Sequence, residues 1–251
     1  MSESKTGLFF PLRVVFGTLI GNGFLIVGTL FWATVALLFG WIGPRGRFIS
    51  WVARVWSRGV LFFSGVRVMP AFETPLDREG QYVFMANHRS LFDIPALLTT
   101  LPGETRFLAK KSLFQIPILG WALEMGGFVT IDRKDLGTAR DSFSDAVAEL
   151  ENAGVSVLVF PEGTRSQSED LLPFKRGGFL LALKSGLAIV PVGIAGSARV
   201  QPKKSFVIRP GVLRVNYGSP LSVQDFGVSR KRELIRAVRE RIEQLIAKGS
   251  P

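Results

Sequence analysis

Residues 81–93 read QYVFMANHRSLFD, and this stretch places a polar cluster at the end of a strand. The run from Gln81 to Ala86 is apolar and has strand character, and a helical pattern begins near Ile94. The polar part, NHRSLFD, therefore falls at a strand-to-helix turn, where α/β proteins commonly carry functional residues. It contains His88, the only histidine among 251 residues. Imidazole is the side chain that most often serves as a general base near neutral pH, so His88 is the first candidate for that role.

The spacing between His88 and Asp93 decides whether the two side chains can meet. On an ideal helix, five residues turn through about 500°, which leaves the side chains about 140° apart. If Asp93 instead caps the helix, with Pro95 in its first turn, His88 lies in the preceding loop and can fold back onto the carboxylate. Asp93 would then orient the ring while the other ring nitrogen takes a proton. The spacing equally fits an ordinary N-cap, at Ser90 or Asp93, beside an ordinary loop histidine.

Composition limits the chemistry that the chain can perform. Its formal net charge of +11 indicates an anionic partner, which could be nucleic acid, phospholipid headgroups or an acidic carrier protein. The absence of cysteine excludes disulfides, thiol nucleophiles and thiolate metal ligands, and one histidine excludes a His-rich metal site. With 251 residues and 47% hydrophobic content, the chain can form one α/β domain with an appendage.

The appendage is predicted at the N-terminus, where Val14 to Trp41 carries no charged residue. As a helix this segment would reach about 42 Å, against a hydrocarbon core of about 30 Å. It could tilt, bend, or form a helical hairpin in one leaflet with Ile49 to Phe63. A cleaved signal peptide is the weaker alternative, because the apolar region exceeds a usual signal-peptide core. We therefore expect a membrane anchor in residues 1–63 and an α/β domain in residues 64–251.

Basic residues flank the anchor unevenly, and this asymmetry predicts its orientation. More of them follow the apolar segment than precede it. The main domain is therefore expected on the cytoplasmic, anionic face of the inner membrane. The residues that follow are Arg45, Arg47, Arg54 and Arg58, and those that precede are Lys5 and Arg13.

Strand and helix patterns alternate after residue 64, which predicts an α/β fold with a mixed, largely parallel sheet flanked by helices. Strands are expected at Val66–Met69, Tyr82–Ala86, Arg106–Ala109, Phe128–Ile131, Val155–Phe160 and Ala188–Val192. Helices are expected at Ile94–Leu101, Ile116–Glu124, Ala139–Leu150 and Gly178–Lys184, and a basic one with an apolar face from Leu234 to Ile246. A late hairpin at an edge of the sheet would pair Phe206–Ile208 with Val212–Asn216.

A second polar cluster follows the predicted buried strand at Val155–Phe160. It reads FPEGTRS from Phe160 to Ser166 and continues as LLPFKRGGF from Leu171 to Phe179. Cations and backbone amides at the end of a sheet bind anions well, and the cations here are Arg165, Lys175 and Arg176. The alternative is a solvated turn in which Gly163 only supplies a positive φ. The cluster is neither a P-loop, a Rossmann turn nor a serine-hydrolase elbow, because the glycine patterns of these motifs are missing.

Two further charged pairs end predicted strands. Lys110 and Lys111 leave one strand and could reach the same anion site, although paired lysines usually lie in solvent. Asp132 and Arg133 end the strand GFVTIDR. Instead of a functional role, they could form a surface ion pair, which would contribute under about 1 kcal/mol to stability.

Three of these blocks, together with IVPVGI at Ile189 to Ile194, resemble the glycerolipid acyltransferases of the lysophosphatidic acid (1-acylglycerol-3-phosphate) acyltransferase type. The resemblance runs from about Gly65 to Gly193. Its blocks, in order, are NHRSLFD with its HX4D core, GFVTIDR, FPEGTRS and IVPVGI. Each block is weak alone, but four in order at the usual spacing are a specific signal.

The resemblance implies acyl transfer from a thioester, on acyl carrier protein or coenzyme A, to the sn-2 hydroxyl of 1-acylglycerol 3-phosphate, giving phosphatidic acid. It implies a general base at His88, an orienting acid at Asp93 and a phosphate-binding arginine at Arg165. Further substrate-binding residues by the same resemblance are Glu162, Gly163, Thr164, one of Lys110 and Lys111, and Arg133. An anionic phospholipid membrane is an expected partner and nucleic acid is not. Direct attack by the hydroxyl needs no enzyme nucleophile, metal or cofactor.

Two alternatives remain at this point. A related enzyme could acylate another lysophospholipid, a lyso-aminolipid or glycerol 3-phosphate, because HX4D serves them all. A protein without catalytic activity could instead use the anchor and the basic surface to bind an anionic ligand at the membrane.

Overall fold

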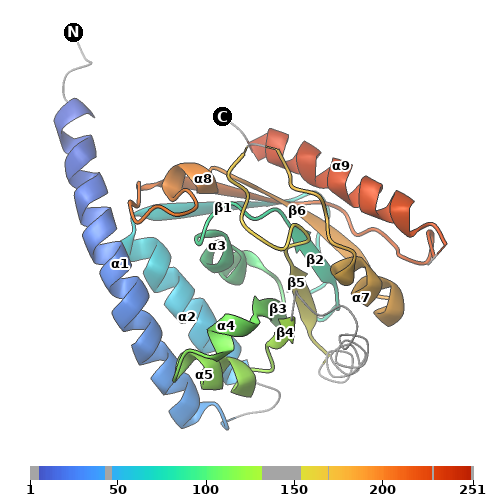
Figure 1. The fold of residues 1–251 in the computed structure, drawn as a ribbon, viewed down its shortest axis with the longest axis horizontal. Helices are drawn as coiled ribbons and strands as arrows, with labels where there is room; N and C mark the ends of the chain where they lie inside the picture. The colour runs from blue at the N-terminus through green and yellow to red at the C-terminus, as the bar shows by residue number, and fades with distance from the viewer. Residues whose placement is uncertain (1–5, 43–46, 132–153, 169, 228, 250–251) are drawn as a thin grey trace.

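The computed structural model describes residues 6–42, 47–131, 154–168, 170–227 and 229–249. Within these residues a seven-stranded sheet has the order β1-β7-β6-β2-β5-β3-β4 (Figure 1). Only β6 and β7 pair antiparallel among these neighbours, so the expected mixed, largely parallel sheet is confirmed. The strands are β1 Val66–Phe72, β2 Val83–Ala86, β3 Thr105–Lys110, β4 Val129–Ile131, β5 Ser156–Val159, β6 Ile189–Ala195 and β7 Gly211–Tyr217.

The central strands are apolar throughout because helices cover both faces of the sheet. Phe84 of β2 packs in a cluster with α2 (Arg47–Phe63) and α3 (Asp93–Thr100). Its neighbours Val83 and Met85 point to the other face, where they pack with α7 (Gly177–Ser185) and α9 (Lys231–Gly249). This alternation has the two-residue period of a strand, and it places the carboxyl ends of β2, β5 and β3 at one edge.

The N-terminal helix α1, Thr6–Phe39, packs along α2 and against α5 (Leu119–Met125). In Figure 1 it stands at one side of the molecule, away from α7 and the first turns of α9. Its segment Pro11–Phe39 is long and apolar enough to cross a membrane, and most of the side chains there are exposed. The predicted apolar helix is therefore present, with one face on the protein and the other uncovered.

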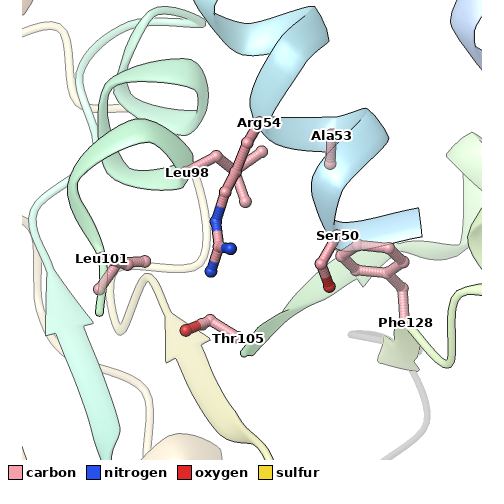
Figure 2. Close-up of a pocket in the computed structure, with 7 residues that line it drawn as sticks. All are labelled: Ser50, Ala53, Arg54, Leu98, Leu101, Thr105 and Phe128. Atoms are coloured by element: carbon pink, nitrogen blue, oxygen red, sulfur yellow. The ribbon is translucent and has the colours of Figure 1, made fainter. Parts of the chain in front are cut away.

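A charged network fastens α2 to the beginning of β3. Figure 2 shows the side chain of Arg54 extending from α2 toward Thr105, the first residue of β3. The Arg106 guanidinium donates to Ser50 Oγ at 2.6 Å and lies 3.6 Å from the Glu104 carboxylate, which is also 3.9 Å from Arg54. Burial lowers the pKa of Arg106, while Glu104 opposes that shift by favouring the charged form. The hydrophobic helix pair is thus bonded to the sheet and does not pack against it through apolar contact alone.

The predicted edge hairpin is wrong. Residues 206–208 form no strand, and β7 lies inside the sheet between β1 and β6. Instead, Ile208 exchanges hydrogen bonds with the Thr18 hydroxyl of α1, at 3.0 Å through its amide and 3.2 Å through its carbonyl. The backbone of this apolar stretch is therefore satisfied by a helix about 190 residues away, which no local pattern indicates.

The helix expected at Ile116–Glu124 is also different. The chain forms a short α4, Lys111–Phe114, and then α5, which begins at Leu119. Ile118 has a φ of 69°, outside the right-handed helical region, so the helix cannot start before it. A one-turn helix, α8 (Ser197–Val200), was not predicted. The helix expected at Ala139–Leu150 lies outside the described residues.

Candidate active site

His88 and Asp93 meet at the end of β2. The Nδ1 atom of His88 lies 2.8 Å from Asp93 Oδ2, so the contact predicted from their spacing is confirmed. The Asp93 side chain is fully buried, and the same oxygen accepts the backbone amides of Arg89 at 2.7 Å and Ser90 at 2.8 Å. These donors compensate the cost of burying the carboxylate and fix its direction.

The predicted N-cap role of Asp93 is wrong. Phe92 occupies the cap position, and no side chain caps α3. Asp93 is the first residue of the helix, and its carboxylate turns back toward the loop that contains His88. Pro95 does lie in the first turn, as predicted, where its missing amide hydrogen costs nothing.

The ring of His88 is held on a second side as well. It stacks on Phe160, which follows β5, with ring centroids 4.1 Å apart and planes 19° from parallel. A carboxylate can only accept, so the neutral imidazole carries its proton on Nδ1 and keeps Nε2 as an acceptor. The side chain is 14% exposed. An oriented and partly exposed imidazole is what a general base requires.

Glu162 joins the two loops that form the site. It is 2% exposed, and its two oxygens accept the amides of His88 at 2.8 Å and Leu172 at 2.9 Å. The backbone amide of Ser166 also donates a hydrogen bond to the His88 carbonyl, at 2.8 Å, and so joins the same two loops. Glu162 was expected to bind substrate, but both of its oxygens are engaged by backbone amides. Its contacts are those of a residue that positions His88.

The turn after β5 carries the candidate anion site. Gly163 has a φ of 70°, and a Cβ there would lie 2.9 Å from the Lys175 side chain. Lys175 therefore passes directly beside the turn, while Thr164 is exposed and Arg165 half-buried. A further cation, Lys203, donates to the Arg165 carbonyl at 2.7 Å. Several positive charges thus gather at this edge of the sheet, as the sequence predicted, with Lys203 as an addition.

The remaining predicted residues divide into two groups. Lys110 ends β3 and Lys111 begins α4, and both side chains are exposed. Because β3 runs parallel to its neighbour β5, both lysines leave the sheet at the same edge as the Gly163 turn. Asp132 and Arg133 lie outside the described residues.

Two side chains without a role predicted from the sequence, Asn87 and Phe160, support His88. Asn87 is fully buried, and its amide exchanges bonds of 2.7 and 3.0 Å with the backbone of Ile194 in β6. This pairing ties the end of β2 to β6 directly before His88. Phe160 supports the ring itself. Only their positions in the sequence could have indicated these two residues, because Asn87 directly precedes His88 and Phe160 begins the FPEGTRS block.

An apolar cavity of about 290 Å³ begins beside the dyad. Leu91, Ile94 and Pro95, which flank Asp93 in sequence, form part of its wall. The other walls come from α1, α2, α3, β3 and α5, including Leu25, Trp32, Trp56, Leu98, Phe107 and Leu123. Its lining is almost entirely apolar, which suits a hydrocarbon chain.

Comparison with known proteins finds acyltransferases. The 1-acyl-sn-glycerol-3-phosphate acyltransferase of Arabidopsis thaliana chloroplasts is 34% identical over 228 residues, covering 88% of this chain. The chain spans 60% of that protein's length. The Salmonella typhimurium protein of the same description is 28% identical over 230 residues, covering 89% of this chain and 92% of that one.

A solved structure and a family model extend the comparison. The crystal structure of the 1-acyl-sn-glycerophosphate (LPA) acyltransferase PlsC from Thermotoga maritima is 25% identical. It matches with a TM-score of 0.77 over 94% of this chain and 97% of its own. A family model described as Acyltransferase matches residues 67–195, just over half of the chain. The matched segment contains both the dyad and the Gly163 turn, and the chain belongs to this acyltransferase family.

Proposed function

We propose that this protein transfers an acyl group from a thioester to the sn-2 hydroxyl of 1-acylglycerol 3-phosphate, giving phosphatidic acid. The thioester is carried by acyl carrier protein or coenzyme A. The observation that carries the proposal is the 2.8 Å contact between His88 and Asp93 at a sheet edge crowded with cations. The acyltransferase relatives that match most of the chain support the same reaction.

In the proposed mechanism, His88 Nε2 removes the proton of the acceptor hydroxyl as its oxygen attacks the thioester carbonyl carbon. Asp93 stabilises the imidazolium that forms. The tetrahedral intermediate then collapses, the carbon–sulfur bond breaks, and the leaving thiolate takes the proton from His88. No covalent bond to the protein forms at any step.

The acceptor phosphate is proposed to bind at the Gly163 turn. Arg165 can engage it through two hydrogen bonds, and Lys175 adds a positive charge beside the same backbone. One of Lys110 and Lys111 completes the site from the end of β3, with Thr164 and Arg133 as further contacts. Glu162 contributes by holding His88 and the turn in register.

The apolar cavity is proposed to hold an acyl chain, and residues 1–63 to anchor the protein, with residues 64–251 forming the catalytic domain. The cavity wall is shared by α1 and by residues beside the dyad, so a chain in it would extend from near the dyad to the protein-facing side of α1. The basic residues after α1 favour the cytoplasmic face of an anionic membrane.

The test is transfer of a radiolabelled acyl group by purified protein in detergent or vesicles, with each thioester donor supplied separately. The acceptor panel contains 1-acylglycerol 3-phosphate, other lysophospholipids, a lyso-aminolipid and glycerol 3-phosphate. We expect turnover of 1-acylglycerol 3-phosphate with at least one donor, and none in His88→Ala. Preference for another acceptor would reassign the substrate, and no thioester-dependent turnover at all would refute the enzymatic function.

A further inference from the structure

The segment Pro202–Arg209, which reads PKKSFVIR, connects α8 to β7 and lies against α1. Three hydrogen bonds join it to that helix. Two are between Thr18 and Ile208, and the third runs from the Asn22 side chain to the Phe206 carbonyl at 2.8 Å. The segment is therefore fixed to the N-terminal helix through its backbone, and the exposed side chains of Phe206 and Val207 remain available for other contacts.

Packing at Gly21 of α1 shows how close this association is. A Cβ at Gly21 would lie 2.5 Å from Ser64 Oγ and 3.0 Å from the Ile208 side chain. The backbone of α1, the junction between α2 and β1, and the 202–209 segment therefore meet at one point. The segment therefore lies directly beside α1 at the level of Thr18 and Asn22.

The tip of the segment is apolar and exposed. Phe206 is 83% exposed and Val207 is 38% exposed. Lys204 and Arg209 flank the tip and are exposed, and no acidic residue occurs between residues 201 and 212. Exposed aromatic and aliphatic side chains beside basic ones are suited to the boundary of an anionic bilayer.

The same segment also reaches the candidate anion site. Lys203 donates to the carbonyl of Arg165 at 2.7 Å and lies 3.5 Å from the Thr164 hydroxyl. It is half-buried, in contrast to its exposed neighbour Lys204. One short stretch of chain therefore contacts both the N-terminal helix and the turn proposed to bind the acceptor phosphate.

We propose that the 202–209 segment is a second membrane contact. Phe206 and Val207 enter the lipid–water boundary of a bilayer that contains anionic phospholipid, and Lys204 and Arg209 contact the headgroup phosphates. Lys203 then holds the Arg165 turn at a fixed height relative to those headgroups. This inference deepens the proposed function, on which it rests, because the height of the turn matters only if the turn binds a lipid phosphate.

The chain contains no cysteine, so one introduced cysteine gives a unique label. We would attach an environment-sensitive fluorophore to Phe206→Cys and, as a control, to Arg236→Cys on the exposed face of α9. We expect vesicles with anionic phospholipid to shift the emission at position 206 to shorter wavelength. Nitroxide-labelled lipid should quench that label and leave position 236 unchanged. Equal, solvent-like emission at both positions on bound vesicles would overturn the proposal.

Activity provides the second measurement. One double variant, Phe206→Ser/Val207→Ser, removes the apolar tip, and another, Lys204→Gln/Arg209→Gln, removes the flanking charges. The control is Arg232→Gln/Arg236→Gln, which removes two positive charges from α9, as many as the second variant removes from the segment. At limiting lipid, we expect each of the first two to lose about tenfold in turnover of an acceptor embedded in anionic vesicles. A short-chain, monomeric acceptor should be turned over normally by both.

An equal loss on the two acceptors would contradict a membrane role and assign these residues to folding or catalysis. If the unmodified protein turns over neither acceptor, the proposed function fails. The fluorophore measurement still decides whether the segment contacts lipid, because it does not depend on catalysis.

Discussion

Two buried carboxylates, those of Asp93 and Glu162, hold different parts of His88. Asp93 binds the ring through Oδ2, and Glu162 binds the backbone amide of the same residue. Backbone amides compensate both carboxylates, with two donated to Asp93 and two to Glu162. Both the ring plane and the position of its main chain are therefore fixed before a substrate arrives.

We expect His88→Ala to lower the turnover number by about a thousandfold or more, because the chain has no second histidine to act as the base. Asp93→Asn should lower it by about 10² to 10⁴-fold, because an amide cannot both orient the ring and stabilise the imidazolium. Rates with saturating acceptor and donor check both changes. The melting temperature of His88→Ala should stay close to that of the unmodified protein, and normal turnover by that variant would refute the dyad.

Arg165→Ala should weaken binding of phosphate-bearing acceptors selectively. Loss of a charge-assisted hydrogen bond costs about 1.5–3 kcal/mol, so the apparent KM should rise by about 10- to 150-fold. A neutral monoacylglycerol, however poor as an acceptor, should show no such rise. Arg236→Ala is the matched control, because it removes an arginine from α9. An unchanged KM for 1-acylglycerol 3-phosphate in Arg165→Ala would place the phosphate elsewhere.

Glu162→Gln separates positioning from substrate binding. Glutamine has only one acceptor oxygen, so one of the two amides now bound to Glu162 loses its partner in a buried place. We expect a loss of about 1–3 kcal/mol in the free energy of unfolding, measured by urea denaturation. Turnover should fall by the same factor for phosphate-bearing and neutral acceptors. A selective effect on phosphate would show instead that Glu162 acts at the anion site.

The sequence predicted the His88–Asp93 contact because five residues across a turn leave few geometries. It misassigned the cap because it could not show that Oδ2 of the carboxylate contacts three nitrogen atoms on its loop side. Phe160 and Lys203 were missed for a different reason. Their partners His88 and Arg165 are 72 and 38 residues away, and only the assembled sheet brings them together.

At the scale of elements, alternation of apolar runs and amphipathic helices was enough to predict the sheet and its main helices. It failed at residues 206–208, where an apolar, β-branched stretch has strand character but bonds to Thr18 and Asn22 of α1. Strand propensity measures how well a residue fits a half-buried surface, and the side of a helix offers a similar one. Local pattern could not distinguish the two.

The end of β1 is joined to α9 by an ion-pair cluster whose strength depends on pH. Glu73, just after β1, accepts bonds from Lys248 and Arg241. The bond from Lys248 lowers the pKa of Glu73, with the nearby charges adding to it and desolvation opposing it. A lowered folded-state pKa contributes stability that is present above the unfolded value and lost as pH falls through the folded one.

We therefore expect Glu73→Gln to lower the melting temperature at pH 7 by a few degrees at most, since the cluster is largely solvent-accessible. The difference between variant and unmodified protein should shrink as pH falls below about 4 and the carboxylate takes up its proton. Calorimetry at several pH values checks both statements. A difference that stays constant from pH 7 to pH 3 would show that packing, and not charge, carries the effect.

The whole molecule is asymmetric, because α1 and α9 lie on different sides of it (Figure 1). Many exposed residues of α1 are large and apolar, whereas those of α9 are mostly charged. Its net charge of +11 attracts it to anionic surfaces over a distance set by salt. The screening length falls from about 14 Å to about 4 Å between 0.05 and 0.5 M salt. We expect turnover of vesicle-embedded acceptor to fall over that range by a larger factor than turnover of a short-chain acceptor. Equal salt dependence of the two would remove long-range attraction as a cause.

Glu162 can hydrogen-bond to the amides of His88 and Leu172 only after all three residues have been synthesised. During synthesis the hydrophobic helix at residues 6–39 leaves the ribosome more than a hundred residues before Leu172 does. Translation at about 5–20 residues per second gives that helix several seconds to find a bilayer while the residue that bears the base still lacks its support. On the proposed anchoring and mechanism, we therefore expect the nascent protein to reach a lipid surface before His88 is held in position, and to become active only there.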